Sequence, residues 1–233
     1  TAEPVTGTSR VSEKDGMVMM FVPSGEFIMG IEDSDLKWYK QQDWCTEENH
    51  CQQLTYQDAM PAHSVYLDSY WVDKFEITND QYKKCVDEGI CTQPYPNHWV
   101  PDYYSSEKYA NYPVINVTWD QASEYCKWVG RRLPTEAEWE KAARGLDGRY
   151  FPWGNQAPYD VLVDYAPNSN HMSEVGSHPA GLSYYGAMDM AGNAWEWVYD
   201  WYVEDYYSYS PKENPNGPIT GEYRVLRGTA QNY

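Results

Sequence analysis

The stretch from Gly186 to Trp201, GAMDMAGNAWEWVYDW, constrains the fold more than any other part of the chain. Three tryptophans and two glycines occur within these sixteen residues. Side chains alternate between the two faces of a strand, so the order predicts a strand with Trp195 and Trp197 on one face and Glu196 on the other. The glycines and polar residues before it predict the turn from which this strand starts.

That turn is rich in groups that bind hard cations. Asp189 lies near its start, and Glu196 lies on the strand face that points back toward the turn. The two carboxylates can therefore share a calcium ion with backbone carbonyls of the turn, since calcium accepts oxygen ligands from side chains and main chain alike. A turn closed by ordinary hydrogen bonds is the alternative, because no Asp-x-Asp-x-Asp loop is present. Spacing alone leaves both interpretations open.

Three short helices are predicted by the same pair of start and stop signals. Each begins with a capping box, in which the first residue and the residue three positions later satisfy each other's free amides. Each ends at a glycine suited to the left-handed conformation that closes a helix. The start pairs and stops are Thr78 with Gln81 and Gly89, Thr118 with Gln121 and Gly130, and Thr135 with Glu138 and Gly145.

Charge and composition limit the classes of ligand. The formal net charge is −18, and no run of Lys and Arg occurs, which argues against binding to nucleic acid or to an anionic membrane. No run of 18 apolar residues is present either, so we expect no membrane insertion. The chain contains 23 Tyr and 11 Trp but only 4 Phe, a composition that suits recognition surfaces.

The five cysteines form two close pairs and one single residue. Cys45 with Cys51 and Cys85 with Cys91 lack the spacing and the nearby histidines of a zinc site. We expect two disulfides, with free thiols as the alternative, and therefore an extracellular or cell-surface location. Cys85 falls in the last turns of the first predicted helix and Cys91 just beyond its end, so their Cα atoms can approach to about 5.5 Å. Cys126 has no obvious partner in the chain.

The rest of the chain predicts one domain, residues 16–233, preceded by a linker arm over residues 1–15, which is polar and lacks periodicity. Residues 17–30 are rich in strand formers and are broken by Pro23, Ser24 and Gly25, so they predict a hairpin. Residues 31–60 are acidic and polar, and they predict a long surface loop. Prolines break every run between residues 146 and 181, which predicts a second long loop region.

Several blocks of the chain resemble the formylglycine-generating enzyme (sulfatase-modifying factor) family. In order, they are GEFIMG, FEITNDQY, YPVINVTWDQASEYCKWVGRRLPTEAEWEKAARG, FPWGN, MDMAGNAWEWVYDW and RVLRG. The resemblance spans residues 17–228. It implies an α+β fold, a single domain with a C-type-lectin-like core, little regular secondary structure, long loops and bound calcium.

The resemblance also implies residues for the metal. One family calcium site maps onto the carboxylates of Asp189 and Glu196 and the carbonyls of Gly192 and Ala194. A second maps onto Asp164 and Tyr165, with a looser match in the residues that follow. Where the family often has Asn, this chain has Asp189, which adds one negative charge.

Catalysis in the oxidising members of the family depends on a cysteine pair that binds copper, in a segment after the RVLRG strand. The present sequence ends at Tyr233, before such a segment and before the terminal strand that closes the family core. We therefore expect the C-terminal strand and the catalytic segment to be missing from this chain. The resemblance also implies a partner for Cys126 in that terminal strand.

Two functions follow from the sequence. The first is a noncatalytic, calcium-stabilised extracellular binding module whose Tyr- and Trp-rich loops bind a protein, or a polar or glycan ligand, and which is tethered to another domain through its N-terminal arm. The second is a copper-dependent oxidase that converts a sulfatase cysteine to formylglycine. The first is favoured because the chain offers no pair of cysteines for copper once the two predicted disulfides have formed.

Overall fold

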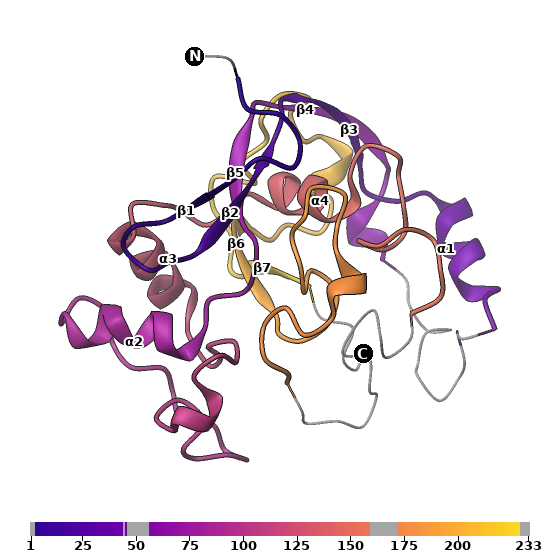
Figure 1. The fold of residues 1–233 in the computed structure, drawn as a ribbon. Coiled ribbons are helices and arrows are strands. Elements are labelled where there is room, and N and C mark those ends of the chain that lie inside the picture. Colours follow the sequence, from indigo (N-terminus) through magenta and orange to yellow (C-terminus); the bar gives the residue numbers. More distant parts are fainter. Residues whose placement is uncertain (1–2, 44, 46–55, 159–171, 229–233) are drawn as a thin grey trace.

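Short helices and small antiparallel sheets, joined by long irregular segments, make up the fold (Figure 1). The computed structural model describes residues 3–43, 45, 56–158 and 172–228. Within these residues the helices are α1 (Asp33–Lys40), α2 (Asn79–Asp87), α3 (Trp119–Trp128) and α4 (Glu136–Arg144). The strands are β1 (Ser9–Val11), β2 (Val18–Val22), β3 (Gly25–Met29), β4 (His63–Leu67), β5 (Tyr70–Asp73), β6 (Glu196–Trp201) and β7 (Arg224–Arg227). This architecture confirms the predicted α+β class with little regular secondary structure.

The described strands form three antiparallel sheets. The first has the order β1-β2-β5, the second pairs β3 with β4, and the third pairs β6 with β7. No helix in the described part of the chain is long and apolar enough to cross a membrane.

Helix α4 lies at the centre of the molecule and packs against β3, β4, β6 and β7 (Figure 1). Its residues 136–143 are all buried, so it has no solvent-facing side. Trp139, Ala142 and Ala143 pack with Val22 and Val198 in the main hydrophobic cluster. This helix therefore joins the second sheet to the sheet that carries the tryptophan-rich strand, and Val22 of the first sheet packs in the same cluster.

The three predicted capping boxes all form. Thr78, Thr118 and Thr135 each accept a hydrogen bond from the backbone N–H three residues later, and the N3 side chain accepts one from the cap residue in return. The glycines predicted as stops, Gly89, Gly130 and Gly145, all have positive φ, between 68° and 75°. These local signals were correct because each depends only on residues within one or two turns of helix.

The predicted hairpin over residues 17–30 is wrong. Two strands do form, but β2 pairs with β1 and β5, whereas β3 pairs with β4 in another sheet. The buried ammonium of Lys141 binds the segment between the two strands, because its Nζ donates hydrogen bonds of 2.9 Å to the carbonyls of both Pro23 and Gly25. A lysine 116 residues from Gly25 thus ties the two sides of this break together.

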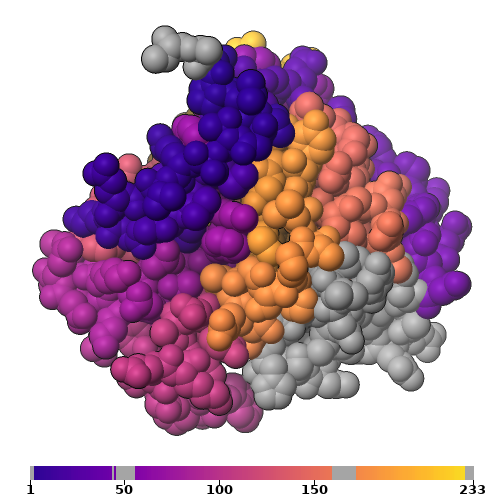
Figure 2. Space-filling model, viewed as in Figure 1, coloured from indigo at the N-terminus to yellow at the C-terminus, as the bar shows by residue number. Residues whose placement is uncertain are grey.

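The predicted linker arm over residues 1–15 is also wrong for its second half. Strand β1 adds to the edge of β2, and the carboxylate of Asp15 is buried against Arg131 of the α3–α4 connection. Figure 2 shows the N-terminal segment, in indigo, packed along the surface of the later segments.

The segment 31–60, which was expected to be a loop, contains helix α1. This helix starts at a capping box formed by Glu32 and Asp35.

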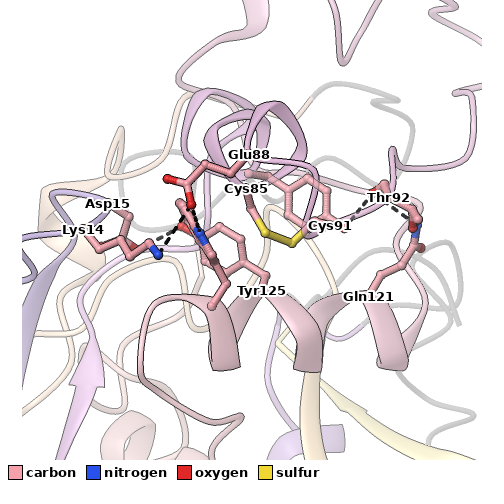
Figure 3. Close-up of a disulfide and its surroundings, with 10 residues drawn as sticks. Lys14, Asp15, Cys85, Glu88, Cys91, Thr92, Gln121 and Tyr125 are labelled. Carbon is pink, nitrogen blue, oxygen red and sulfur yellow. Dashed lines mark hydrogen bonds and ion pairs between the residues drawn. A yellow bond between two sulfur atoms is a disulfide. The ribbon is translucent and has the colours of Figure 1, made fainter.

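One disulfide confirms the predicted pairing of Cys85 with Cys91, whose Cα atoms lie 5.2 Å apart. It joins the end of α2 to the following loop, above Tyr125 of α3 (Figure 3). Cys45 is also disulfide-bonded. Its predicted partner, Cys51, lies outside the described residues.

Candidate functional site

The tryptophan-rich strand forms as predicted. β6 pairs with β7, and along it Val198 and Asp200 are buried while Tyr199 is 45% exposed. Trp195, which immediately precedes the strand, is 41% exposed, whereas Glu196 turns toward the interior, where its Oε2 accepts a hydrogen bond of 3.1 Å from the Nε1 of Trp139. The predicted division of Trp195 and Glu196 between two faces is confirmed.

The turn before β6 has an unusual backbone. Asp189 and Asn193 take positive φ values of 61° and 59°, and Gly192 takes 102°. A left-handed conformation is costly for residues with a side chain, so surrounding contacts must hold it. The N–H of Gly192 donates to the carbonyl of Gly228, and the Oδ2 of Asp189 accepts a 2.6 Å hydrogen bond from the N–H of Gly176.

Glu76 also supports this turn, through two hydrogen bonds, and sequence reasoning missed it. Its Oε1 accepts from the N–H of Ala194 at 2.8 Å, and its Oε2 accepts from the side-chain amide of Asn193 at 2.6 Å. The Oδ1 of Asn193 in turn accepts from the N–H of Ser173. Glu76 lies 118 positions before Ala194, and its only signal in the sequence was its place in the FEITNDQY block.

Two of the predicted ligand oxygens converge at Gly228. A Cβ atom added to this glycine would lie 3.2 Å from the carbonyl oxygen of Ala194 and 3.3 Å from the Oε1 of Glu196. Gly228 therefore leaves open a small space that both oxygens face. A backbone carbonyl and a carboxylate oxygen are both kinds of ligand that a hard cation such as calcium accepts.

The electrostatics of the turn also favour a cation. Burial raises the pKa of Glu196 to about 8; the hydrogen bond from Trp139 opposes this, and the charge of Asp189 adds to it. Burial likewise raises the pKa of Glu76, and Glu196 and Asp189 raise it further. Three acidic side chains thus repel one another in a region largely shielded from water.

Side-chain geometry alone does not define a metal centre here. Within the described residues, no group of three or more His, Cys, Asp and Glu side chains is arranged to hold a metal ion. The predicted ligand set has only two carboxylates and relies on carbonyls for the rest, as calcium permits. The second predicted site, Asp164 and Tyr165, lies outside the described residues.

A wide groove of about 1640 Å³ opens beside the turn. Its aromatic lining comes from three parts of the chain: the loop after the disulfide, the region around η3 (Glu107–Tyr109) and α3, and the start of β6. The aromatic residues are Tyr95, Trp99, Tyr103, Tyr109, Tyr112, Trp119, Trp195 and Trp197. Trp99 is 78% exposed and Tyr95 is 66% exposed, so the groove presents large apolar side chains to solvent.

The inner rings of the groove are fixed by the protein itself. The Nε1 of Trp119 donates to the carbonyl of Val198 at 2.7 Å, and the Nε1 of Trp197 donates to the carbonyl of Val117 at 2.9 Å. The guanidinium of Arg224 lies against Trp119, 3.6 Å from the ring centre. These rings cannot turn freely, so the surface is organised before any ligand arrives.

The described cysteines do not form a thiolate pair. Cys85 and Cys91 are bonded to each other, and Cys126 is a free, partly buried thiol on α3 that lines a cavity of about 350 Å³. Burial raises the pKa of the Cys126 thiol to about 12, and the nearby charge of Asp73 raises it as well. This thiol is therefore protonated at neutral pH and is a poor metal ligand.

Comparison with known proteins identifies the family. The model of the sulfatase-modifying factor enzyme 1-like domain matches residues 4–232. The chain belongs to this family. It is 33% identical over 225 residues to the serine/threonine-protein kinase pkn1 of Chlamydia caviae, covering 90% of this chain but 32% of the kinase. It is 29% identical over 261 residues to the formylglycine-generating enzyme of Mus musculus, covering 90% of this chain and 65% of the enzyme.

The family domain is also similar in structure to PvdO from Pseudomonas aeruginosa. The TM-score is 0.74 at 21% identity, over 97% of this chain and 87% of that one. At this identity the match supports the fold and no shared activity. The present chain spans about a third of the kinase and about two thirds of the mouse enzyme, so it corresponds to one part of these longer relatives.

Proposed function

We propose that this family domain is a noncatalytic extracellular binding module, stabilised by calcium, whose binding surface is the aromatic groove. The observation that carries the proposal is the groove itself, with exposed Trp99 and Tyr95 at its rim and rings fixed by hydrogen bonds inside it. Exposed aromatic surface of this extent commonly marks a site of interaction, and rigid rings bind with little loss of conformational entropy.

Calcium would be held by the turn that borders the groove. Asp189 and Glu196 would supply charged ligands, and Gly192 and Ala194 would supply carbonyls. The bound ion would neutralise the buried carboxylates and fix the position of Trp195, which lines the groove directly after Ala194. Asp164 and Tyr165 would be ligands of a second ion.

The setting we propose is the cell surface or the extracellular space. The Cys85–Cys91 disulfide favours an oxidising compartment. The similarity to one third of a protein named as a kinase supports attachment to a further domain, and we place the tether in the residues before Ser9, where β1 begins. The partner would be a protein, or a polar or glycan ligand.

A copper-dependent oxidase is the alternative, and the described residues do not support it. Copper(I) prefers two accessible soft thiolates, whereas the cysteines in the described part of the chain are disulfide-bonded or, for Cys126, protonated and partly buried. Incubation with copper(I) and a sulfatase-derived peptide containing CxPxR, followed by mass spectrometry, should show no aldehyde. Conversion of the peptide would overturn the noncatalytic proposal.

Thermal unfolding tests the calcium site. Raising free calcium to about 100 times its Kd should raise the Tm of the wild-type chain by about 5–10 °C relative to chelator, since the ion binds only the folded state. Glu196→Gln should abolish most of this difference. Asp147→Asn, which removes a surface carboxylate paired with Arg149, serves as the matched control and should retain it. A Tm that calcium and chelator leave unchanged would contradict the calcium proposal.

Binding to mixed arrays of immobilised peptides, proteins and oligosaccharides tests the groove. The Trp99→Ala and Trp195→Ala variants should lose the interactions that the wild-type chain makes. Tyr223→Ala removes an aromatic ring that is 64% exposed outside the groove and should retain them. Interactions that survive both groove substitutions, or an absence of any interaction, would overturn the proposal.

A further inference from the structure

The charge of the groove differs sharply from the charge of the chain. The sequence contains 35 Asp and Glu residues and has a formal net charge of −18. Yet none of the described residues that line the groove is Asp or Glu, and Lys108 is the one that carries a full charge. The Nζ of Lys108 already lies 3.1 Å from the hydroxyl of Tyr109, to which it donates a hydrogen bond.

The neutrality of the groove narrows the class of ligand. A cationic peptide would find no carboxylate to pair with among the described lining residues, and a polyanion would meet a single lysine there, in a strongly acidic molecule. The ligand that fits best therefore carries no net charge. It must also offer apolar faces, since exposed rings dominate the rim.

The polar groups between the rings suit hydroxyl groups. Asn97, Asn116, Thr118 and Ser173 line the groove and can donate and accept hydrogen bonds without charge. The Oδ1 of Asn97 accepts from the backbone N–H groups of Trp99 and Val100, which fixes this side chain against the backbone of the most exposed aromatic residue of the groove. In the described part of the chain no hydrogen bond uses the Nδ2 of Asn97, so its two N–H groups remain for a ligand.

We propose that the ligand of the groove is a neutral oligosaccharide, an inference that rests on the proposed binding function and specifies its ligand. The C–H bonds on the face of a pyranose ring carry partial positive charge and match the negative face of an aromatic ring. Its hydroxyl groups match the amides and hydroxyls between the rings. The sugar stacks on Trp99 and Tyr95 at the rim and donates to or accepts from Asn97 and Asn116. A groove of about 1640 Å³ accommodates several sugar units.

Titration calorimetry with four kinds of probe tests this ligand class. The probes are neutral hexasaccharides (cello-, chito-, manno- and malto-oligosaccharides), an anionic heparin hexasaccharide, hexalysine and a proline-rich decapeptide. At least one neutral hexasaccharide should bind saturably, and the anionic and cationic probes should not. Trp99→Ala should weaken this binding at least about fivefold, as expected for the loss of an aromatic contact. Tyr223→Ala should leave it unchanged.

A substitution that keeps the size of the Asn97 side chain isolates the contribution of its N–H donors to sugar binding. Asn97→Asp keeps the oxygen that caps the loop but replaces the N–H donors with a charge, so it should weaken the hexasaccharide and strengthen hexalysine. If the proline-rich peptide binds, no sugar binds, and Trp99→Ala weakens the binding of the peptide, the sugar inference would be overturned and the binding function would stand. Failure of all four kinds of probe would overturn the sugar inference alone. Sugar binding that Trp99→Ala leaves unchanged would overturn both the sugar inference and the groove as the binding surface.

Discussion

At the scale of single residues, Asp15 shows how strongly neighbouring groups can change the pKa of a buried carboxyl. Its side chain is fully buried, and its carboxylate accepts hydrogen bonds from the guanidinium of Arg131 at 2.5 and 3.2 Å and from the hydroxyl of Tyr125 at 2.9 Å. Burial alone would raise the pKa of this carboxyl, but the hydrogen bonds and the charge of Arg131 outweigh burial and lower it to about 2. Figure 3 shows Asp15 beside Tyr125.

Asp15 therefore predicts a specific loss of stability in acid. Because its pKa is lower in the folded state than its ordinary value of 3.8, it stabilises the fold above about pH 4, and this contribution is lost as the pH falls toward 2. Asp15→Asn should cost about 3 kcal/mol at pH 7, since it leaves a largely buried arginine with weaker pairing. Urea unfolding at several pH values measures both effects. The cost should shrink between pH 4 and pH 2, and a cost that stays constant over this range would contradict the assignment.

Gly228 predicts a second effect at the same scale. Its φ is 107°, and an added Cβ would crowd the two oxygens of the proposed calcium site. Gly228→Ala should therefore lower the Tm and also reduce the stabilisation by calcium. Gly130→Ala is the matched control, because Gly130 also has positive φ (75°) but has no atom within 4 Å of the added Cβ. Equal calcium responses in the two variants would argue against ligands at Ala194 and Glu196.

At the scale of elements, we expect the N-cap of the buried helix α4 to contribute more to the stability of the fold than the N-cap of an exposed helix. Thr135 is 4% exposed, and Glu138, which closes its capping box, also pairs with Arg132. Thr135→Ala should lower the free energy of unfolding by about 1–2 kcal/mol, the upper part of the range for a lost cap. Thr118→Ala, at the exposed cap of α3, should cost about 0.5–1 kcal/mol. Urea denaturation of both variants measures the difference, and a larger loss at Thr118 would contradict this ranking.

At this scale, features that depend on nearby residues could be predicted from the sequence, whereas pairings between distant segments could not. The helices, their caps, the Cys85–Cys91 bridge and the strand around Glu196 follow from residues close together in the chain. The partners of β2 and β3 do not, because they lie far away in the sequence and Lys141, on a distant helix, binds the segment between the two strands. The same is true of the candidate site: the places of Asp189 in the turn and Glu196 on the strand follow from one stretch of sequence, whereas Glu76 reaches the turn only after folding.

At the scale of the whole molecule, the net charge of −18 is spread over 233 residues and opposes compaction. Raising monovalent salt from about 0.01 to 0.15 M shortens the Debye length from about 30 to 8 Å and screens this repulsion. We therefore expect the Tm to rise over this range when chelator is present to remove divalent ions. Differential scanning calorimetry measures the shift. A fall in Tm would show that ion pairs such as Arg227 with Glu140 outweigh the net repulsion.

The buried amine of Lys141 can be used to measure when the core of the molecule opens. Its side chain is 0% exposed, and burial lowers its pKa to about 8. An acylating reagent at pH 8 should therefore modify the surface lysines within minutes while this amine remains unlabelled. Modification of Lys141 requires the separation of α4 from the Pro23–Gly25 segment. Mass spectrometry of a single tryptic peptide can thus time the opening of the core without any introduced probe.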